Sequence, residues 1–252
     1  MDITVLLSVV PDTTVRVTLS DEGVPALSEV PWVINPWDEL ALTRALELKE
    51  DPAAGVERVC VLHAGPAEHE TLLRRALAMG ADEAVRVDAV PGDAWSAAVL
   101  LVSWLREHPA ALVLAGPETT DHGGGATGMM VAQQLGIAAS GSVTAISVEQ
   151  NRILFTREMD EGTETFAVQP PFLAVVQKGI AREPRMPSMR GLMMARRRPV
   201  TVVTPPSEET PLRRSAGWEM PPEKPPVKLI PPERAEEILD LLEKETRTIK
   251  IS

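Results

Sequence analysis

Residues 111–128 read ALVLAGPETTDHGGGATG, a short apolar run followed by a glycine-rich polar loop. The run at 112–115 has no polar face, which is typical of a parallel strand that helices cover on both sides. The glycines at 123–125 lack a Cβ, so their backbone can approach an anion closely, and a helix expected from Ala126 onward would add the positive end of its dipole. The stretch predicts a nucleotide or anion site, although a mobile surface loop has the same composition.

Segments on both sides of this loop alternate between strand-like and helix-like patterns. Apolar runs that read as strands lie at 3–10, 58–62, 84–87 and 112–115, and helical stripes lie at 36–50, 67–79 and 93–107. The alternation predicts an α/β fold, a doubly wound and mostly parallel, Rossmann-like sheet of the adenine-nucleotide-binding kind. Ligands of such sheets bind at the carboxyl ends of the strands, near the point where the strand order reverses. The loops expected to converge there are residues 10–13, 35–38, 63–66 and 116–127.

Two local features are expected before the second strand. Asn35 precedes Pro36 and an acidic first turn, so Asn35 should cap a helix in which Pro36 is the first residue. Val15, Val17 and Leu19 alternate with polar residues, which predicts an exposed hairpin.

The pattern changes in the second half of the chain. Alternating segments at 143–148, 152–159 and 163–168 predict antiparallel hairpin additions to the sheet. The apolar run at 172–176 predicts one more buried strand.

The C-terminal region is expected to be an arm that packs on another surface. It has nine prolines between 205 and 232 and too few apolar residues to form a core of its own. A final helix is expected to place three apolar side chains on one face: Ile238, Leu241 and Leu242. We therefore divide the chain into a nucleotide-binding α/β domain, residues 1–204, and a proline-rich arm with a C-terminal docking helix, residues 205–252.

Composition and charge indicate the cellular compartment and the kinds of partner to expect. The formal net charge of −11 argues against nucleic acid as the main partner. The N-terminus has an acid where a signal peptide needs basic residues, and the longest apolar helical stretch, 95–105, is too short to span a bilayer. The single cysteine, Cys60, lies in an apolar strand and cannot form an internal disulfide. We expect a cytoplasmic protein without membrane insertion.

Sequence signatures of catalysis and of metal binding are not found. The four histidines share no metal-ligand spacing with each other or with Cys60, and GxSxG, Walker A and paired-carboxylate patterns do not occur. His122 in the glycine-rich loop could face a ligand, but a lone loop histidine is more often solvated. We therefore expect no catalytic residues and no metal, and interpret the chain as a binding or carrier protein.

Residues 178–198 form a basic segment in an acidic chain. They carry seven basic residues and one acid, and four methionines lie among them: Met186, Met189, Met193 and Met194. An isolated arginine triplet would usually be solvated, or could bind RNA. Flexible thioethers adapt to differently shaped apolar pockets, however, and arginines reach acidic rims. The combination favours a docking loop for several partner proteins.

Long motifs in a fixed order identify a resemblance. They are VVPDTT at 9–14, NPWDELALTRALELKE at 35–50, HAGPAEHETLLRRALAMGAD at 63–82, AGPETTDHGGGATG at 115–128, REMDEGTE at 157–164 and AREPRMPSMRGLMMARRRP at 181–199. With these motifs the chain resembles, from end to end, the beta subunit of electron-transfer flavoprotein.

The resemblance implies an electron carrier that has no substrate turnover of its own. The beta subunit would form a heterodimer with an alpha subunit that holds the redox FAD, and would itself bind one structural AMP. Acyl-CoA-type dehydrogenases of fatty acid oxidation would dock and deliver electrons, which pass on to a quinone oxidoreductase. The family's nucleotide positions map to Leu6, Asn35, Pro36, Trp37, Asp38, Ala64, Gly116, Thr120, Asp121, His122, Gly123, Gly124, Gly125, Ala126 and Thr127. Its docking segment maps to residues 177–199, with Met189 as the apolar anchor and with Arg185, Met186, Leu192, Met193, Arg196, Arg197 and Arg198 around it.

Three departures from the family pattern leave alternatives open. Ser8 stands where a lysine is usual, the three glycines at 123–125 replace acidic and amide side chains, and Glu161 replaces a small residue. The nucleotide could be the second FAD of electron-bifurcating relatives, although Thr127 and Gly128 favour AMP. The same fold would also allow a nucleotide-responsive binding module without a redox role, but such a module would need neither the docking segment nor the arm.

Overall fold

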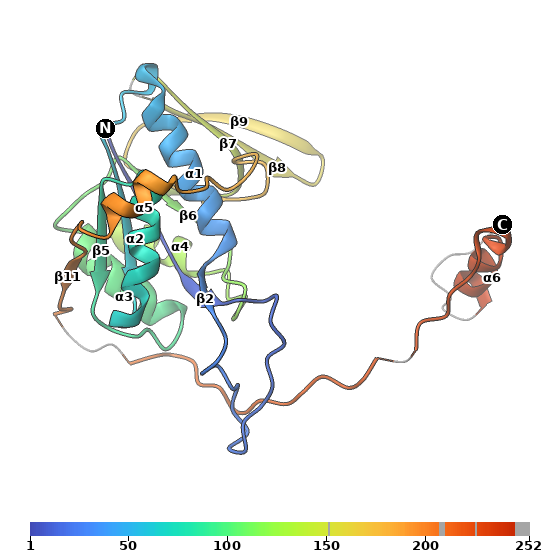
Figure 1. The fold of residues 1–252 in the computed structure, drawn as a ribbon. Helices are drawn as coiled ribbons and strands as arrows, with labels where there is room; N and C mark the ends of the chain where they lie inside the picture. Colours follow the sequence, from blue (N-terminus) through green and yellow to red (C-terminus); the bar gives the residue numbers. More distant parts are fainter. Residues whose placement is uncertain (151, 207–209, 225, 245–252) are drawn as a thin grey trace. The chain divides into compact units, whose positions relative to one another are not determined.

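The computed structural model describes residues 1–150, 152–206, 210–224 and 226–244 (Figure 1). The chain divides into two compact units, Met1–Trp218 and Glu219–Ser252. The proposed division at residue 204 stays a prediction.

The first unit is built on a nine-stranded sheet, in the order β11-β5-β4-β1-β6-β10-β7-β8-β9. Its strands are β1 (Asp2–Leu6), β4 (Arg58–Ala64), β5 (Glu83–Val87), β6 (Leu112–Ala115), β7 (Ala138–Glu149), β8 (Arg152–Met159), β9 (Gly162–Val168), β10 (Phe172–Val176) and β11 (Thr201–Val203). All neighbouring strands from β11 to β7 are parallel, whereas β7, β8 and β9 pair antiparallel. The predicted α/β class with antiparallel hairpin additions is confirmed.

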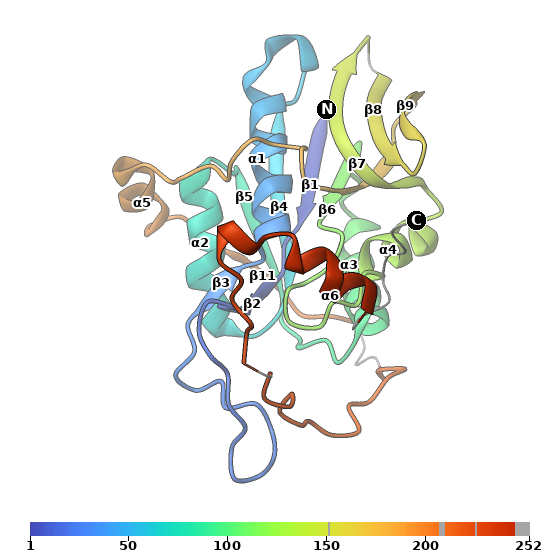
Figure 2. The ribbon, with the colours of Figure 1, turned by 90° about the vertical axis from the view of Figure 1, so that its right-hand side faces the viewer.

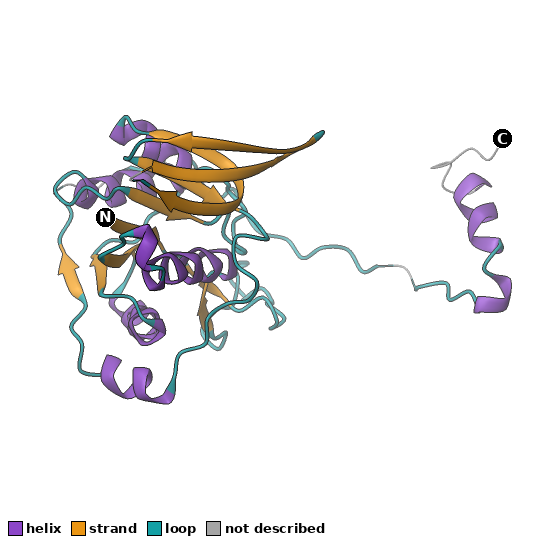
Figure 3. Cartoon of the chain, turned by 90° about the horizontal axis from the view of Figure 1, so that it is seen from above, coloured by secondary structure: helices purple, strands orange, loops and turns teal. Residues whose placement is uncertain are grey.

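Helices cover both faces of the sheet (Figures 2 and 3). They are α1 (Pro36–Glu50), α2 (Glu70–Met79), α3 (Ala94–Leu105), α4 (Thr127–Leu135) and α5 (Met189–Ala195), with short 3-10 turns at Pro52–Ala54 and Ala67–His69. One apolar core joins α1 and α2 to one face of the sheet, and a second core joins α3 and α4 to the other face. The predicted doubly wound arrangement is therefore present.

Strand β1 shows why the central strands are mostly apolar. In β1, Ile3 and Val5 pack in the core under α1 and α2, whereas Leu6 packs in the core under α3 and α4. Successive side chains of a strand point to opposite faces, so a strand covered on both sides has apolar residues on both faces. Gly128 lets α4 approach closely, because a Cβ there would lie 2.9 Å from Val175 Cγ2.

The N-terminal region differs from its prediction. The expected single strand at 3–10 is two strands, because β1 ends at Leu6 and β2 (Val9–Pro11) pairs antiparallel with β3 (Trp32–Ile34) in a separate small sheet. The chain turns at Ser8, whose carbonyl accepts the Asn35 N–H and whose own N–H binds α1. The predicted hairpin at 15–19 is reduced to one isolated bridge, Leu19 with Pro25.

Strand β7 converts the parallel sheet into an antiparallel one. Its first part, from Ala138, pairs in parallel with β10, and its second part, up to Glu149, pairs antiparallel with β8. Ser142 has a positive φ of 55° where the two pairings meet. The predicted strand at 143–148 captured only the second part, because the first half of β7 is rich in small residues.

The second unit contains a 3-10 turn at Pro232–Arg234 and helix α6 (Glu237–Lys244). Ile238 and Leu239 are each nearly half exposed within it. The last residues of the predicted docking helix, 245–252, lie outside the described part of the chain. Across the described residues, no helix has both the length and the apolarity needed to cross a membrane.

Candidate functional site

The strand order reverses at β1, which lies between β4 and β6. The chain leaves β1 through α1 to β4 and β5 on one side, and returns through α3 to β6 on the other. Leu6, the last residue of β1, is aligned with Leu62 of β4 and with Ala115 of β6. The carboxyl ends of these strands therefore meet at the kind of switch point where doubly wound sheets bind ligands.

Asp38 in the first turn of α1 fastens the loops around this point. Its Oδ2 accepts a hydrogen bond from the Ser8 N–H (2.8 Å), and its Oδ1 accepts one from the Gly116 N–H (2.9 Å). Gly116 has no room for a side chain, because a Cβ there would lie 2.4 Å from Asp38 Oδ1 and 2.7 Å from Trp37 Cβ. The start of α1 is thus held against the ends of β1 and β6.

Two residues of the predicted nucleotide site, Asp38 and Leu6, have buried side chains that contact other parts of the protein. Burial raises the pKa of Asp38 to about 6, against the effect of the Ser8 and Gly116 N–H groups, which favour its charged form. Both Asp38 oxygens already accept backbone hydrogen bonds, so this side chain positions the loops. The Leu6 side chain is buried in the core, which leaves only its backbone for a ligand.

Asn35 occupies the predicted N-cap position but does not cap α1 with its side chain. Its backbone carbonyl accepts the Asp38 and Glu39 N–H groups, while its Nδ2 donates to the Glu118 carbonyl (2.9 Å). The side chain therefore joins α1 to the start of the glycine-rich loop. Asn35 is fully buried, and its Oδ1 has no hydrogen-bond partner among the described residues. An unfilled buried acceptor of this kind costs free energy unless a ligand or water donates to it.

The glycine-rich loop forms the exposed rim of this point. Gly123 and Gly125 have positive φ values of 57° and 59°, in the left-handed region that favours glycine. Asp121 accepts a hydrogen bond from the His122 N–H (2.7 Å), so its carboxylate folds back onto the loop. Thr120 through Gly125 are exposed, and Ala126 and Thr127 mark the start of α4 as predicted. Of the remaining predicted positions, Pro36 is exposed and Trp37 and Ala64 are half-buried.

Sequence reasoning left His63 unassigned, although it supports the loop after β4. Its Nδ1 faces the Leu7 carbonyl at 2.8 Å and its Nε2 faces His69 Nδ1 at 2.9 Å. Because a carbonyl can only accept, His63 carries its proton on Nδ1 and accepts from His69 through Nε2. Burial lowers the pKa of His63 to about 4, which keeps the ring neutral near neutral pH. A Cβ on Gly65 would lie 2.2 Å from His63 Nε2, so the loop rests directly on the ring.

Arg86 is a second residue that the sequence pattern did not reveal. Its side chain is 5% exposed, donates to the Gly65 carbonyl at 2.9 Å, and forms ion pairs with Glu70 and Asp88. These contacts hold the β4–α2 loop in place. A buried cation within a strand could be recognised from the sequence only if its acidic partners were known.

Residues 177–199 were predicted to form a docking loop. The prediction of a continuous loop is wrong, because the segment contains helix α5. Ser188 caps this helix by accepting the Gly191 N–H (3.0 Å). Arg185 pairs with Glu50 of α1 at 2.6 Å, and its backbone N–H donates to Thr43 Oγ1 at 2.9 Å. The segment is thereby attached to α1 at its beginning.

The far end of this segment is attached to α2 and to the turn that follows it. Arg198 donates through Nη1 to the Ala81 carbonyl (2.8 Å) and through Nη2 to the Asp82 carbonyl. Gly191 allows the closest approach, since a Cβ there would lie 2.4 Å from the Ala78 carbonyl oxygen. Predicted docking residues Arg185 and Arg198 therefore hold the segment in place, whereas Arg196 and Arg197 are exposed.

The outer side of the segment is apolar and exposed. Five large apolar side chains are from 37 to 75% exposed here: Met186, Met189, Leu192, Met193 and Met194. We call these five residues the methionine patch. Contiguous exposed apolar side chains are common at the interaction surfaces of proteins.

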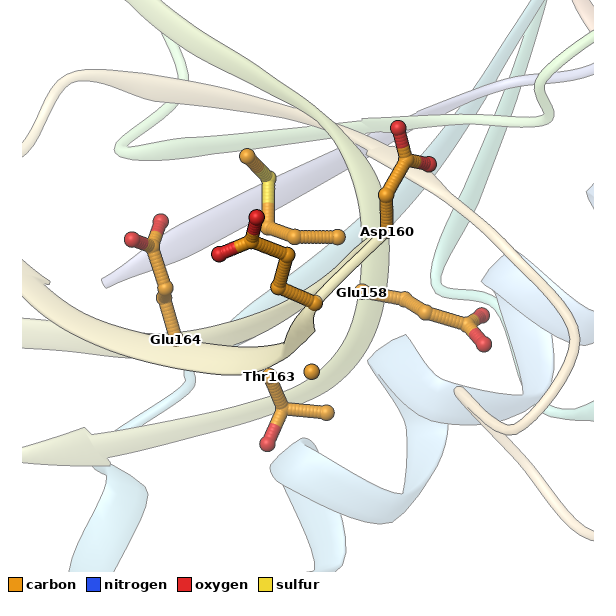
Figure 4. Close-up of a pocket in the computed structure, with 7 residues that line it drawn as sticks. Glu158, Asp160, Thr163 and Glu164 are labelled. Carbon is orange, nitrogen blue, oxygen red and sulfur yellow. The ribbon is translucent and has the colours of Figure 1, made fainter.

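A separate hollow lies at the turn between β8 and β9. It measures about 530 Å³ and is lined by residues 158–164. Figure 4 shows the carboxylates of Glu158, Asp160 and Glu164 pointing in different directions. Within the described residues, no group of three or more His, Cys, Asp or Glu side chains is placed to hold a metal ion.

Comparison with known proteins places these features in a family. Residues 24–208 match the family model described as the electron transfer flavoprotein domain. The chain is 36% identical over 214 residues to the electron transfer flavoprotein subunit beta of Mycobacterium bovis, covering 81% of this chain and 79% of that protein. It is 30% identical over 231 residues to the protein of the same name from Bacillus subtilis, covering 86% and 88% of the two chains. It is 32% identical over 201 residues to that of Syntrophomonas wolfei, covering 79% and 78%.

Proposed function

The chain belongs to the electron transfer flavoprotein family, among the beta subunits, and we propose that it binds AMP in the crevice beside β1 while dehydrogenases dock on its methionine patch. Membership of this family gives the chain an electron-transfer role together with an alpha subunit. In our proposal the alpha subunit holds most of the FAD, which supplies one- and two-electron chemistry when bound. Electrons pass from acyl-CoA-type dehydrogenases to a quinone-linked acceptor, in the cytoplasm, without substrate turnover by this chain.

The observation that carries the nucleotide proposal is the buried, unfilled amide oxygen of Asn35. It lies on the residue that links α1 to the glycine-rich loop, so a donor group of the nucleotide, such as a ribose hydroxyl or an adenine amino group, could satisfy it. The nearby glycine loop and the N-terminus of α4 suit the phosphate, because glycine backbone can approach an anion and the helix dipole attracts it. These features fit a nucleoside monophosphate.

Acid extraction of the purified heterodimer tests this proposal. We expect about one equivalent of AMP for each beta chain and a smaller amount from an Asn35→Ala variant, because the variant loses the buried acceptor. A Gly217→Ala variant is the matched control, since Gly217 has open space around its backbone. Two equivalents of FAD in place of AMP would assign the crevice to a second flavin, and an extract without nucleotide would reject the site.

Docking is supported by the exposure and fixed position of the methionine patch. Met189 is 75% exposed, and burying it in a partner's apolar pocket would contribute about 1.5–3 kcal/mol. Met189→Ala should therefore weaken dehydrogenase-dependent flavin reduction by roughly tenfold or more, with AMP content and heterodimer unchanged. Val90→Ala removes an equally exposed side chain, 72% accessible, from another surface and serves as the control. Equal transfer rates for both variants would contradict the anchor role.

A further inference from the structure

Four thioethers lie open to solvent within nine residues of the docking segment. Met186, Met189, Met193 and Met194 are 72, 75, 69 and 58% exposed. Met79, in contrast, lies at the end of α2 and is 3% exposed. Met129, Met159 and Met220 lie between these extremes, at 39, 45 and 45%. Susceptibility of methionine to oxidation follows its exposure, so the four methionines of the docking segment should be oxidised first and Met79 much later.

The fold keeps the four sulfur atoms exposed. The close approach of Gly191 to the Ala78 carbonyl, and the hold of Arg198 on the Ala81 and Asp82 carbonyls, attach the inner side of α5 to α2. Ala195, on that inner side, is 2% exposed. Helix α5 consequently cannot rotate to bury Met189, Met193 and Met194 without breaking these contacts.

We propose that Met186, Met189, Met193 and Met194 form a peroxide-oxidisable site whose conversion to methionine sulfoxide blocks partner docking. The inference rests on the docking function proposed above. A thioether lone pair attacks one oxygen of hydrogen peroxide, the O–O bond breaks, and the displaced hydroxide leaves as water with the remaining peroxide proton. Sulfur is oxidised by two electrons and peroxide is reduced, which leaves a polar S=O group on a previously apolar side chain.

The consequence for docking follows from desolvation. An apolar pocket that accepts a thioether would have to accept a sulfoxide oxygen without a hydrogen-bond donor, and burying such an oxygen is unfavourable. Arg190 lies between the methionines, Arg196 and Arg197 follow them, and none of the three reacts with peroxide, so the electrostatic part of the surface remains. Oxidation therefore removes the apolar part of recognition selectively.

The test treats the purified heterodimer with a graded series of hydrogen peroxide concentrations. Cleavage after arginine places Met186 and Met189 on one peptide, Met193 and Met194 on a second, and Met79 on a third. We expect the first two peptides to gain oxygen well before the third. Dehydrogenase-dependent flavin reduction should fall in parallel by about tenfold or more, while AMP content and heterodimer size stay constant. Methionine sulfoxide reductase should restore the rate.

A variant in which all four methionines are replaced by leucine is the matched control. Leucine keeps an apolar side chain of similar volume and has no sulfur, so peroxide should leave the rate of this variant equal to its own rate before treatment. Patch peptides that oxidise no faster than the Met79 peptide would overturn the proposal, as would full oxidation with an unchanged rate. Equal losses in the parental and leucine proteins would place the sensitive group elsewhere. Failure of docking itself is distinguished by Met189→Ala, which is measured without peroxide.

Discussion

Asp38 and His63 are buried titratable side chains that support neighbouring crevice loops with opposite pH dependence. Burial raises the pKa of Asp38 to about 6, so the folded chain binds a proton more tightly than the unfolded chain between about pH 4 and 6. Burial lowers the pKa of His63 to about 4, so over the same range the unfolded chain binds the extra proton. Stability falls with rising pH through Asp38 and increases with rising pH through His63, and the two effects offset each other in the parental protein.

Single substitutions should reveal each contribution. Between pH 4.5 and 5.5, the slope of the free energy of unfolding against pH should be more negative in His63→Asn than in the parental chain. The difference in slope should be up to about 1.4 kcal/mol per pH unit. Asp38→Asn should shift the slope by a similar amount in the opposite direction. Urea unfolding at several pH values measures both slopes, and the comparison of slopes is independent of any constant loss of stability. Shifts of the same sign in both variants would contradict the assignment.

The sequence predicted which loops meet at the switch point but not how their atoms are connected. Asn35 and Asp38 were expected from the helix-start pattern, and both lie at the switch point. Whether their side chains cap the helix, bind a loop or remain free depends on Ser8, Gly116 and Glu118, which are distant in sequence. His63 begins one of the quoted motifs but received no role, and Arg86 lies in no motif, because their partners are groups that only the fold brings close.

At the scale of elements, helix α5 is positioned by its glycine. A Cβ at Gly191 would lie 2.4 Å from the Ala78 carbonyl oxygen, so α5 must shift outward to accept it. Gly191→Ala should therefore weaken dehydrogenase-dependent flavin reduction although no side chain of the methionine patch changes. Gly217→Ala, at a glycine with open space, should leave the rate unchanged. A Gly191→Ala protein with the parental rate would show that docking tolerates displacement of α5.

The arginines that follow α5 are expected to have two different roles, one in stability and one in association with dehydrogenases. Arg198 binds two backbone carbonyls at the α2–β5 turn, so Arg198→Ala should lower the free energy of unfolding by about 1–3 kcal/mol at any salt concentration. Arg196 and Arg197 are exposed, and their double replacement by alanine should slow dehydrogenase association mainly at low salt, because exposed charges are screened beyond about 10 Å at 0.1 M. Urea unfolding and a salt series of reduction rates measure the two effects. A stability loss in the double variant would contradict this separation.

For the whole molecule, periodicity alone predicted the alternating α/β order, because strands buried on both faces are mostly apolar without the alternation of a half-exposed strand. It did not give the break of the first strand at Ser8, which depends on hydrogen bonds to Asn35 and Asp38. Periodicity also did not show that the beginning of the arm, up to Trp218, belongs to the first unit. Leu212 and Arg213 donate their N–H groups to Asp93 Oδ2 at 2.7 and 3.0 Å, and a Cβ on Gly92 would lie 2.3 Å from Pro211.

These contacts predict that the arm has two parts with different roles. A chain that ends at Trp218 keeps the Asp93 contacts, so its free energy of unfolding should equal that of the full chain, whereas a chain that ends at Thr204 should be less stable. Both should bind the alpha subunit more weakly, because each lacks α6 with its exposed Ile238 and Leu239. Urea unfolding of the two truncated chains and gel filtration of each with the alpha subunit give the comparison. If the chain ending at Trp218 bound the alpha subunit as tightly as the full chain, residues 219–252 would have no part in the heterodimer.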